Sequence, residues 1–140
     1  MNVHTRRFVE DDTEAVVALW EACGLTRPWN DPRADIARKL SVQPELFRVA
    51  VFRESVVGSI MAGYDGHRGW LYYLATDPEH RGRGIATQLV REAEEGLRDL
   101  GCPKAQLMVR SDNPAVLDFY ERLGYEPSKV STLGKRLIID

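Results

Sequence analysis

Alternating and short continuous apolar runs predict five strands in the first 110 residues of this chain. These runs are rich in valine, isoleucine, phenylalanine and tyrosine, residue types that favour a half-buried strand. They cover residues 3–8, 46–52, 56–64, 70–76 and 104–110. Only Arg53-Glu54-Ser55 separates the second run from the third, so we expect a hairpin there. One or two further strands are expected within residues 125–139, around Gly134.

Apolar residues spaced three or four apart predict four helices between and after these strands. Each predicted helix starts near a polar or glycine residue, and three of them stop at a glycine. The second takes Asp31 as its N-cap and Pro32 as its first residue. The predicted helices occupy residues 11–24, 31–40, 84–101 and 111–124.

The order of these elements predicts an α+β fold. Its central sheet would be mixed but mostly antiparallel, with six to seven strands flanked by four helices. A right-handed crossover through the third helix makes residues 70–76 and 104–110 parallel neighbours. Thr76 and Arg110 would then end at the same edge of the sheet, close to Asn113. Ligands bind at such strand ends, so we expect the functional site there.

Composition and charge narrow the class of protein. The chain has 140 residues, of which 44% are hydrophobic and 29% charged, and we expect residues 1–140 to form a single domain. A formal net charge of −2 gives no general attraction to nucleic acid or to acidic membranes, and neither is an expected partner. No apolar run of spanning length occurs, so the expected compartment is the cytoplasm. The two cysteines and three histidines lack metal-ligand spacing, and no metal is expected.

The turn Arg81-Gly82-Arg83-Gly84 carries the strongest chemical signal. It follows a predicted strand and opens a helix, and a helix start presents free N–H groups and a positive dipole end to an anion. The glycines let the backbone approach a ligand closely, and the arginines add positive charge. This arrangement suits a pyrophosphate. A dinucleotide-binding fold is disfavoured, because Thr87 stands where the third glycine of G-x-G-x-x-G belongs.

Two motifs resemble the signatures of the GNAT acyltransferase superfamily. Arg81-Gly82-Arg83-Gly84-Ile85-Ala86 matches R/Q-x-x-G-x-G/A, and residues 113–125 look like N-x-x-A/V-x-x-x-Y-x-x-x-G-F/Y. Within the superfamily, residues 28–32, 63–69 and 133–137 are similar to the small stand-alone bacterial acetyltransferases called YpeA. The resemblance covers almost the whole chain. It implies an acetyl-CoA-dependent N-acetyltransferase in which a primary amine attacks the thioester directly in a ternary complex.

The resemblance also implies which residues hold acetyl-CoA. Backbone amides of the glycine turn would bind the pyrophosphate. The end of the preceding strand would lie along the pantetheine arm, where a backbone N–H polarises the thioester carbonyl. Asn113 would contact the cofactor, serve as an N-cap before Pro114, or do both. The implied cofactor-binding residues are Leu74, Ala75, Thr76, Arg81, Gly82, Arg83, Gly84, Ile85, Ala86 and Asn113.

Tyr120 matches the tyrosine of the second motif, which implies a general acid that protonates the departing CoA thiolate. A tyrosine on a helix face otherwise packs in the core. The general base stays open, because Trp70 stands where some family members carry a glutamate. Asp65, His67, Tyr72 or Tyr73 and a water chain are the alternatives, although Asp65-Gly66 is also an ordinary turn pair.

The acceptor is expected to be a small-molecule or peptide amine of open identity. In the family, the connection between the first two helices forms one wall of the acceptor pocket, where Trp29 would close over the substrate or act as a packed anchor. The expected substrate-binding residues are Trp29, Asp65, His67 and Tyr72. A homodimer is common in the family. The alternative function is a non-catalytic acyl-CoA-binding or sensing module.

Overall fold

A single mixed sheet organises the computed structural model, which describes residues 2–140. The strand order is β1-β2-β3-β4-β5, antiparallel except for the parallel pair β4–β5. The strands are β1 (Val3–Arg7), β2 (Phe47–Phe52), β3 (Ser55–Tyr64), β4 (Gly69–Thr76) and β5 (Ala105–Gln106). The helices are α1 (Thr13–Ala22), α2 (Pro32–Leu40), α3 (Ile85–Asp99) and α4 (Pro114–Arg122).

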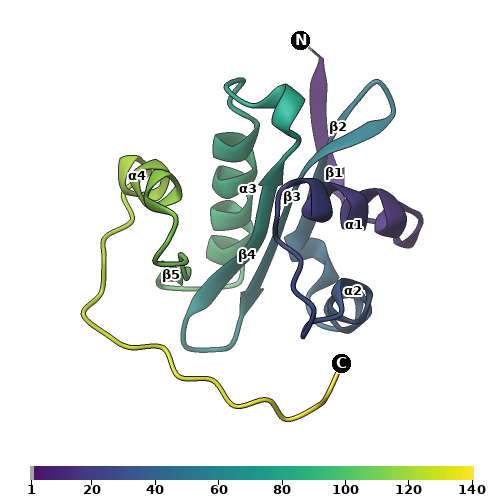
Figure 1. Cartoon of the computed structure of the whole chain (residues 1–140). Helices are drawn as coiled ribbons and strands as arrows, with labels where there is room; N and C mark the ends of the chain where they lie inside the picture. Colours follow the sequence, from purple (N-terminus) through teal and green to yellow (C-terminus); the bar gives the residue numbers. More distant parts are fainter. Residues whose placement is uncertain (1) are drawn as a thin grey trace.

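Helices cover both faces of the sheet. Helices α1 and α2 lie on one side, and α3 and α4 lie on the other (Figure 1). Strand residues alternate between two buried clusters, because successive side chains point to opposite faces. Trp20 and Phe47 belong to the cluster under α1 and α2, whereas Leu89 and Ile60 belong to the cluster under α3. In residues 2–140 we find no helix with both the length and the apolarity needed to cross a membrane.

Local signals predicted most of these elements correctly. Asp31 caps α2 with Pro32 as its first residue, and Asn113 precedes α4. The β2–β3 hairpin turns at Arg53 and Glu54, which both have positive φ (48° and 67°). Two positive φ angles are typical of the tight turn that matches the twist of a hairpin.

Two predictions for the C-terminal part are wrong. The strand expected at 104–110 is reduced to Ala105–Gln106, and the chain that the structure describes after α4 contains no strand. The sheet therefore has five strands instead of six to seven. Strand-forming residues need a neighbouring strand edge, and the tail lies apart from the sheet below β5 (Figure 1). Its apolar side chains stay in solvent: Leu133, Leu137 and Ile139 are 93%, 87% and 92% exposed.

Candidate active site

The glycine turn opens α3 without a side-chain cap. Gly84 is the N-cap residue with φ of 80°, it makes no side-chain cap hydrogen bond, and the first turn has no acidic residue. By contrast, Asp31 accepts hydrogen bonds from the first turn of α2, and Asn113 accepts one from Val116 N in α4. The first N–H groups of a helix have no acceptor within the helix. The start of α3 therefore retains the donors that an anion would need.

The two glycines are required by backbone conformation and not by packing. Gly82 and Gly84 have φ of 78° and 80°, and a Cβ at either position would meet nothing within 4 Å. Because no atom lies within 4 Å of either Cβ position, the space in front of the turn is open. Ile85, by contrast, is buried against the sheet, so a ligand could meet only its backbone. Arg81, Arg83 and Ala86 are at least partly accessible at the same turn.

Arg81 connects the turn to the end of β4. Its Nε donates to the carbonyl oxygen of Thr76 at 3.4 Å, and its Nη2 lies 3.8 Å from Cys23 Sγ. The Cys23 thiol donates to the same carbonyl oxygen at 3.3 Å. Sequence reasoning missed this contact, because Cys23 follows α1 and nothing local links it to β4.

A bulge interrupts β4 immediately before the predicted cofactor strand end. Ser59 pairs with Ala75 and Met61 with Tyr72, so Tyr73 and Leu74 lie opposite the single residue between Ser59 and Met61. Tyr73 has φ of 52°, which a tyrosine rarely adopts. Such bulges re-aim backbone groups next to active sites.

Ser59 holds this bulge through a buried chain of hydrogen bonds. Its hydroxyl, on a fully buried residue (0% exposed), donates to the Tyr73 carbonyl oxygen at 2.8 Å. Trp20 Nε1 donates to the same hydroxyl at 2.9 Å. The Trp20 and Tyr73 rings stack with centroids 3.7 Å apart. Ser59 is a lone polar residue inside the apolar run 56–62, and this sequence signal could have identified it.

Beyond the first two residues of β4, its outer edge separates from β5. The pairs Gly69–Ala105 and Trp70–Gln106 form the whole ladder between these strands within the described chain. We call the part of β4 beyond Trp70, which has no ladder partner in β5, the gap between these strands; it includes Leu74, Ala75 and Thr76. Leu74 packs toward the α3 side of the sheet and Ala75 toward the α1 side.

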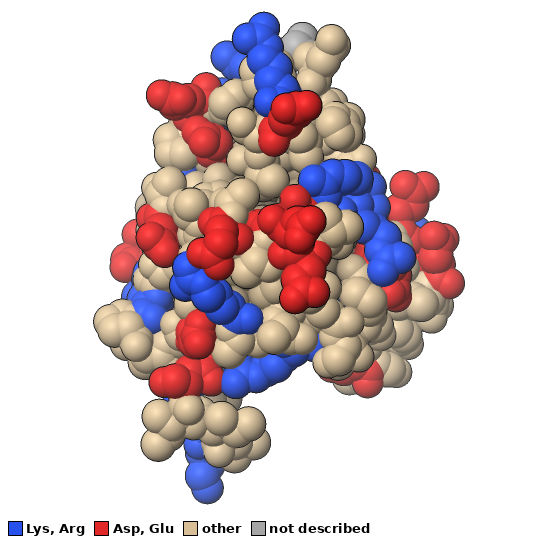
Figure 2. Space-filling model, turned by 90° about the vertical axis from the view of Figure 1, so that its right-hand side faces the viewer, with Lys and Arg blue, Asp and Glu red and all other residues tan. Residues whose placement is uncertain are grey.

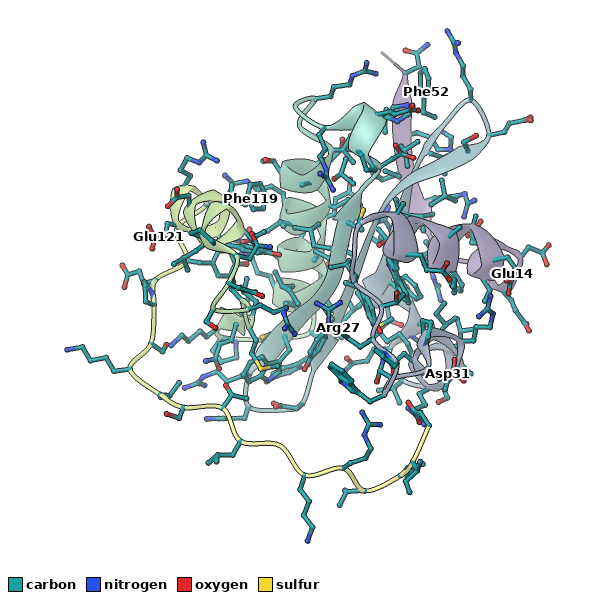
Figure 3. All side chains as sticks on the ribbon, in the orientation of Figure 1. Glu14, Arg27, Asp31, Phe52, Phe119 and Glu121 are labelled. Atoms are coloured by element: carbon teal, nitrogen blue, oxygen red, sulfur yellow. The ribbon has the colours of Figure 1, made fainter. Side chains whose placement is uncertain are left out.

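Tyr120 lies on the α4 side of the gap. It is 6% exposed, its ring packs edge-on against Phe119 and Tyr125, and burial raises its pKa. Figure 3 shows Phe119 on the α4 helix beside α3. A hollow of about 800 Å³ between α3, β5, α4 and the tail is lined by Tyr120, Tyr125 and Glu94. None of residues 81–86 lines this hollow.

A second hollow, which we call the α2 hollow, opens on the other face. It measures about 600 Å³ and is lined by Leu25, Asp35, Arg38, Lys39, Val42, Met61, Tyr72 and Tyr73. Of the predicted substrate-binding residues it contains Tyr72, whose pKa is raised by burial. The side of the molecule on which α1 and α2 lie carries acidic and basic side chains side by side (Figures 1 and 2).

The other predicted substrate-binding residues do not line the α2 hollow. Asp65 Oδ1 accepts from the backbone N–H groups of His67 and Arg68 at 2.8 and 2.7 Å, as in an ordinary loop turn. These hydrogen bonds lower the pKa of Asp65 and so make it a weaker base. His67 is exposed in the same loop, and Trp29 is 59% exposed before α2. Residues 2–140 bring together no three His, Cys, Asp or Glu side chains suited to a metal ion.

Comparison with known proteins gives consistent matches. The model of the Acetyltransferase (GNAT) family matches residues 7–125. An acetyltransferase of Pectobacterium atrosepticum is 57% identical over 135 residues, which make up 96% of both chains. Ard1 from Thermoplasma volcanium has a TM-score of 0.82 at 26% identity, over 91% of this chain and 85% of its own. A chain of the NatC complex bound to Gag peptide and CoA has a TM-score of 0.81 at 26% identity, over 92% and 87%.

Proposed function

Because the chain belongs to the GNAT acetyltransferase family and is an acyltransferase, we propose that it transfers an acetyl group from acetyl-CoA to a primary amine. The amine would be part of a small molecule or a peptide. One structural neighbour was solved with both a peptide and CoA, which supports CoA as the carrier. The family prediction from the two sequence motifs is confirmed.

The uncapped start of α3 is the observation that carries this proposal. Backbone N–H groups of residues 81–86 would hold the pyrophosphate, with the charge of Arg81 and Arg83 beside them. Asn113 accepts its N-cap hydrogen bond with a side-chain oxygen, which leaves its amide group available toward the same ligand. The residues present therefore fit a pyrophosphate-containing substrate.

The gap between β4 and β5 suits the remainder of acetyl-CoA. Unpaired edge groups of Leu74, Ala75 and Thr76 would bind the pantetheine arm, as an added strand would. The bulge at Tyr73 would aim a backbone N–H at the thioester oxygen and stabilise the negative charge that develops there. Holding amine and thioester together in one ternary complex would supply much of the rate.

Tyr120 is our candidate for the general acid. As the amine nitrogen bonds to the carbonyl carbon, the carbon–sulfur bond breaks and its electrons move to sulfur. The phenol would donate its proton to that thiolate. Tyr120 is protonated at neutral pH, as this role needs; burial raises its pKa, which keeps the proton on the phenol until a thiolate forms beside it. Direct transfer requires no covalent acyl-enzyme, and Cys23 is already hydrogen-bonded to a backbone carbonyl.

A matched pair of glycine variants tests the substrate site. Gly84 and Gly101 have φ of 80° and 83°, and a Cβ at either position meets nothing within 4 Å. Tryptophan at either site costs the same left-handed strain, about 1–2 kcal/mol. Only Gly84→Trp would block the turn.

Calorimetric titration with acetyl-CoA, CoA and NAD measures the effect. We expect micromolar binding of acetyl-CoA, about −8 kcal/mol, by the wild type and Gly101→Trp. Binding by Gly84→Trp should fall at least about tenfold, or about 1.4 kcal/mol, and NAD should bind to none of the proteins. Equal binding by both variants would contradict the proposed site. Release of CoA in the presence of an amine panel then separates an enzyme from a module that only binds acyl-CoA.

A further inference from the structure

We infer that Tyr73 and Asp35 form the proton-accepting pair for the acceptor amine, with Tyr73 touching the amine and Asp35 behind it. This inference rests on the proposed function. It assigns the general base, which the sequence left open because Trp70 stands where the family resemblance implies a glutamate in some members. The two residues come from different elements, β4 and α2, and meet in the wall of the α2 hollow.

A compact set of hydrogen bonds defines the pair. The Tyr73 hydroxyl donates to Asp35 Oδ2 at 2.6 Å and accepts from Asn30 Nδ2 at 3.1 Å. Asn30 Nδ2 also lies 2.6 Å from Asp35 Oδ2. A hydroxyl oxygen has two lone pairs, so one remains for an N–H of a ligand in the hollow. Because the Tyr73 proton points to a carboxylate, its oxygen gains acceptor strength from a charge-assisted bond.

The backbone position of Tyr73 connects this pair to the thioester. Tyr73 is the bulged residue next to Leu74, whose backbone borders the gap proposed for pantetheine. Stacking on Trp20 fixes the ring plane, and the Ser59 hydroxyl fixes the carbonyl. An amine that enters the α2 hollow would therefore meet the Tyr73 hydroxyl on the face of the sheet opposite Tyr120.

The proton leaves the amine in two coupled transfers. An ammonium N–H gives its proton to Tyr73 Oη while the Tyr73 O–H gives its own proton to Asp35 Oδ2. The freed nitrogen lone pair can then form the carbon–nitrogen bond. The step leaves a neutral amine and a carboxylic acid, with Tyr73 again carrying one proton. Asp35 afterwards returns the proton to solvent, which its partly exposed side chain (24%) permits.

Charges around the pair come from three sides. On α2, Arg38 Nη1 lies 3.5 Å from Asp35 Oδ1, and Lys39 lines the same hollow with its pKa lowered by burial. From the tail, Asp140 forms an ion pair with Arg38 at 2.7 Å. On β4, Tyr72 is the neighbouring titratable group. Arg38 therefore pairs with both carboxylates, and Asp35 is the one that accepts from the Tyr73 hydroxyl.

The test compares Tyr73→Phe and Asp35→Asn with the wild type across pH. Phenylalanine keeps the ring that stacks on Trp20, and asparagine keeps an oxygen that can accept from Tyr73. Tyr64→Phe is the matched control, since the Tyr64 hydroxyl donates to the Gly66 carbonyl oxygen at 3.3 Å and Tyr64 does not line the α2 hollow. Steady-state kcat/KM is measured from pH 7 to pH 10 with an alkyl amine of lysine-like pKa. Calorimetry with acetyl-CoA monitors the substrate site.

Loss of the base slows only the reaction that starts from the protonated amine, because a neutral amine needs no deprotonation. We expect kcat/KM of Tyr73→Phe to fall about 10²–10³-fold at pH 7, and to recover toward the wild type at pH 10, where more amine is already neutral. Asp35→Asn should follow the same profile, and acetyl-CoA affinity should not change. A loss of equal size at every pH, or one below about threefold at pH 7, would overturn the pair. If the wild type acetylates no amine, the proposed function fails together with it; if it does and Tyr73→Phe matches it, only the pair fails.

Discussion

Replacement of Ser59 with alanine should destabilise the protein far more than the loss of one small hydroxyl suggests. Ser59 accepts from Trp20 Nε1 at 2.9 Å and donates to the Tyr73 carbonyl oxygen at 2.8 Å, and the residue is fully buried. Alanine would leave a buried N–H donor and a buried carbonyl acceptor without partners. Each such group costs about 1–3 kcal/mol, so we expect a loss of about 3 kcal/mol in the free energy of unfolding.

Urea unfolding followed by tryptophan fluorescence measures this loss directly, and calorimetry gives the melting temperature. For 140 residues, about 2 cal/mol/K of unfolding entropy per residue converts about 3 kcal/mol into a decrease of about 10 °C in Tm. Ser41→Ala is the control, because that exposed hydroxyl donates to the Arg38 carbonyl oxygen at the end of α2. It should cost no more than about 0.5 kcal/mol.

A double-mutant cycle tests the reasoning more strictly. Trp20→Phe removes the N–H donor but keeps an aromatic ring, so the double variant should cost less than the sum of the two single changes. The coupling between the two sites should be about 1 kcal/mol. A loss below about 0.5 kcal/mol for Ser59→Ala, or strict additivity in the cycle, would refute the hydrogen-bonded chain as the support of the bulge.

Three further changes test other parts of the molecule. The Arg6 guanidinium, 2.7 Å from Asp12, lowers the pKa of Asp12 in the folded state. The ion pair therefore adds to the free energy of unfolding at neutral pH, and this contribution is lost as pH falls below about 4. In Asp12→Asn, the urea concentration at the midpoint of unfolding should decrease less between pH 7 and pH 3 than in the wild type. Tyr120→Phe should lower kcat by about 10²-fold without changing the acetyl-CoA Kd, and a tighter or weaker Kd would argue for a packing role. Asp31→Ala removes the N-cap that Arg33 N donates to at 2.9 Å. It should cost about 1 kcal/mol in urea unfolding, and no measurable loss would show that the cap is dispensable.

Local chemistry explains what could be predicted from the sequence. Asp31 before Pro32, Asn113 before Pro114 and the glycine turn act within a few residues of themselves, and each marks the start of a helix in the structure. The family motifs depend on the same short segments. Their order was therefore sufficient to predict the four helices and the first four strands, and it makes the glycine turn the candidate substrate site.

Long-range pairing explains what the sequence did not reveal. The bulge at Tyr73 depends on Ser59, which lies on the neighbouring strand, and the Tyr73 hydroxyl reaches Asp35, 38 positions earlier. Neither contact has a periodic signature. The predicted C-terminal strands failed for a related reason, since strand propensity cannot indicate whether a sheet edge is within reach.

The short ladder between β4 and β5 would make the stability of the fold depend on the concentration of the proposed substrate. Within residues 2–140, two residue pairs join these strands, so β5 and α4 are attached to the main sheet with little backbone support. A ligand that bridges the gap adds its binding free energy to that of folding, about 2.7 kcal/mol at a concentration 100 times its Kd. The lifetime of the folded chain against proteolysis would then rise and fall with the acetyl-CoA concentration around it.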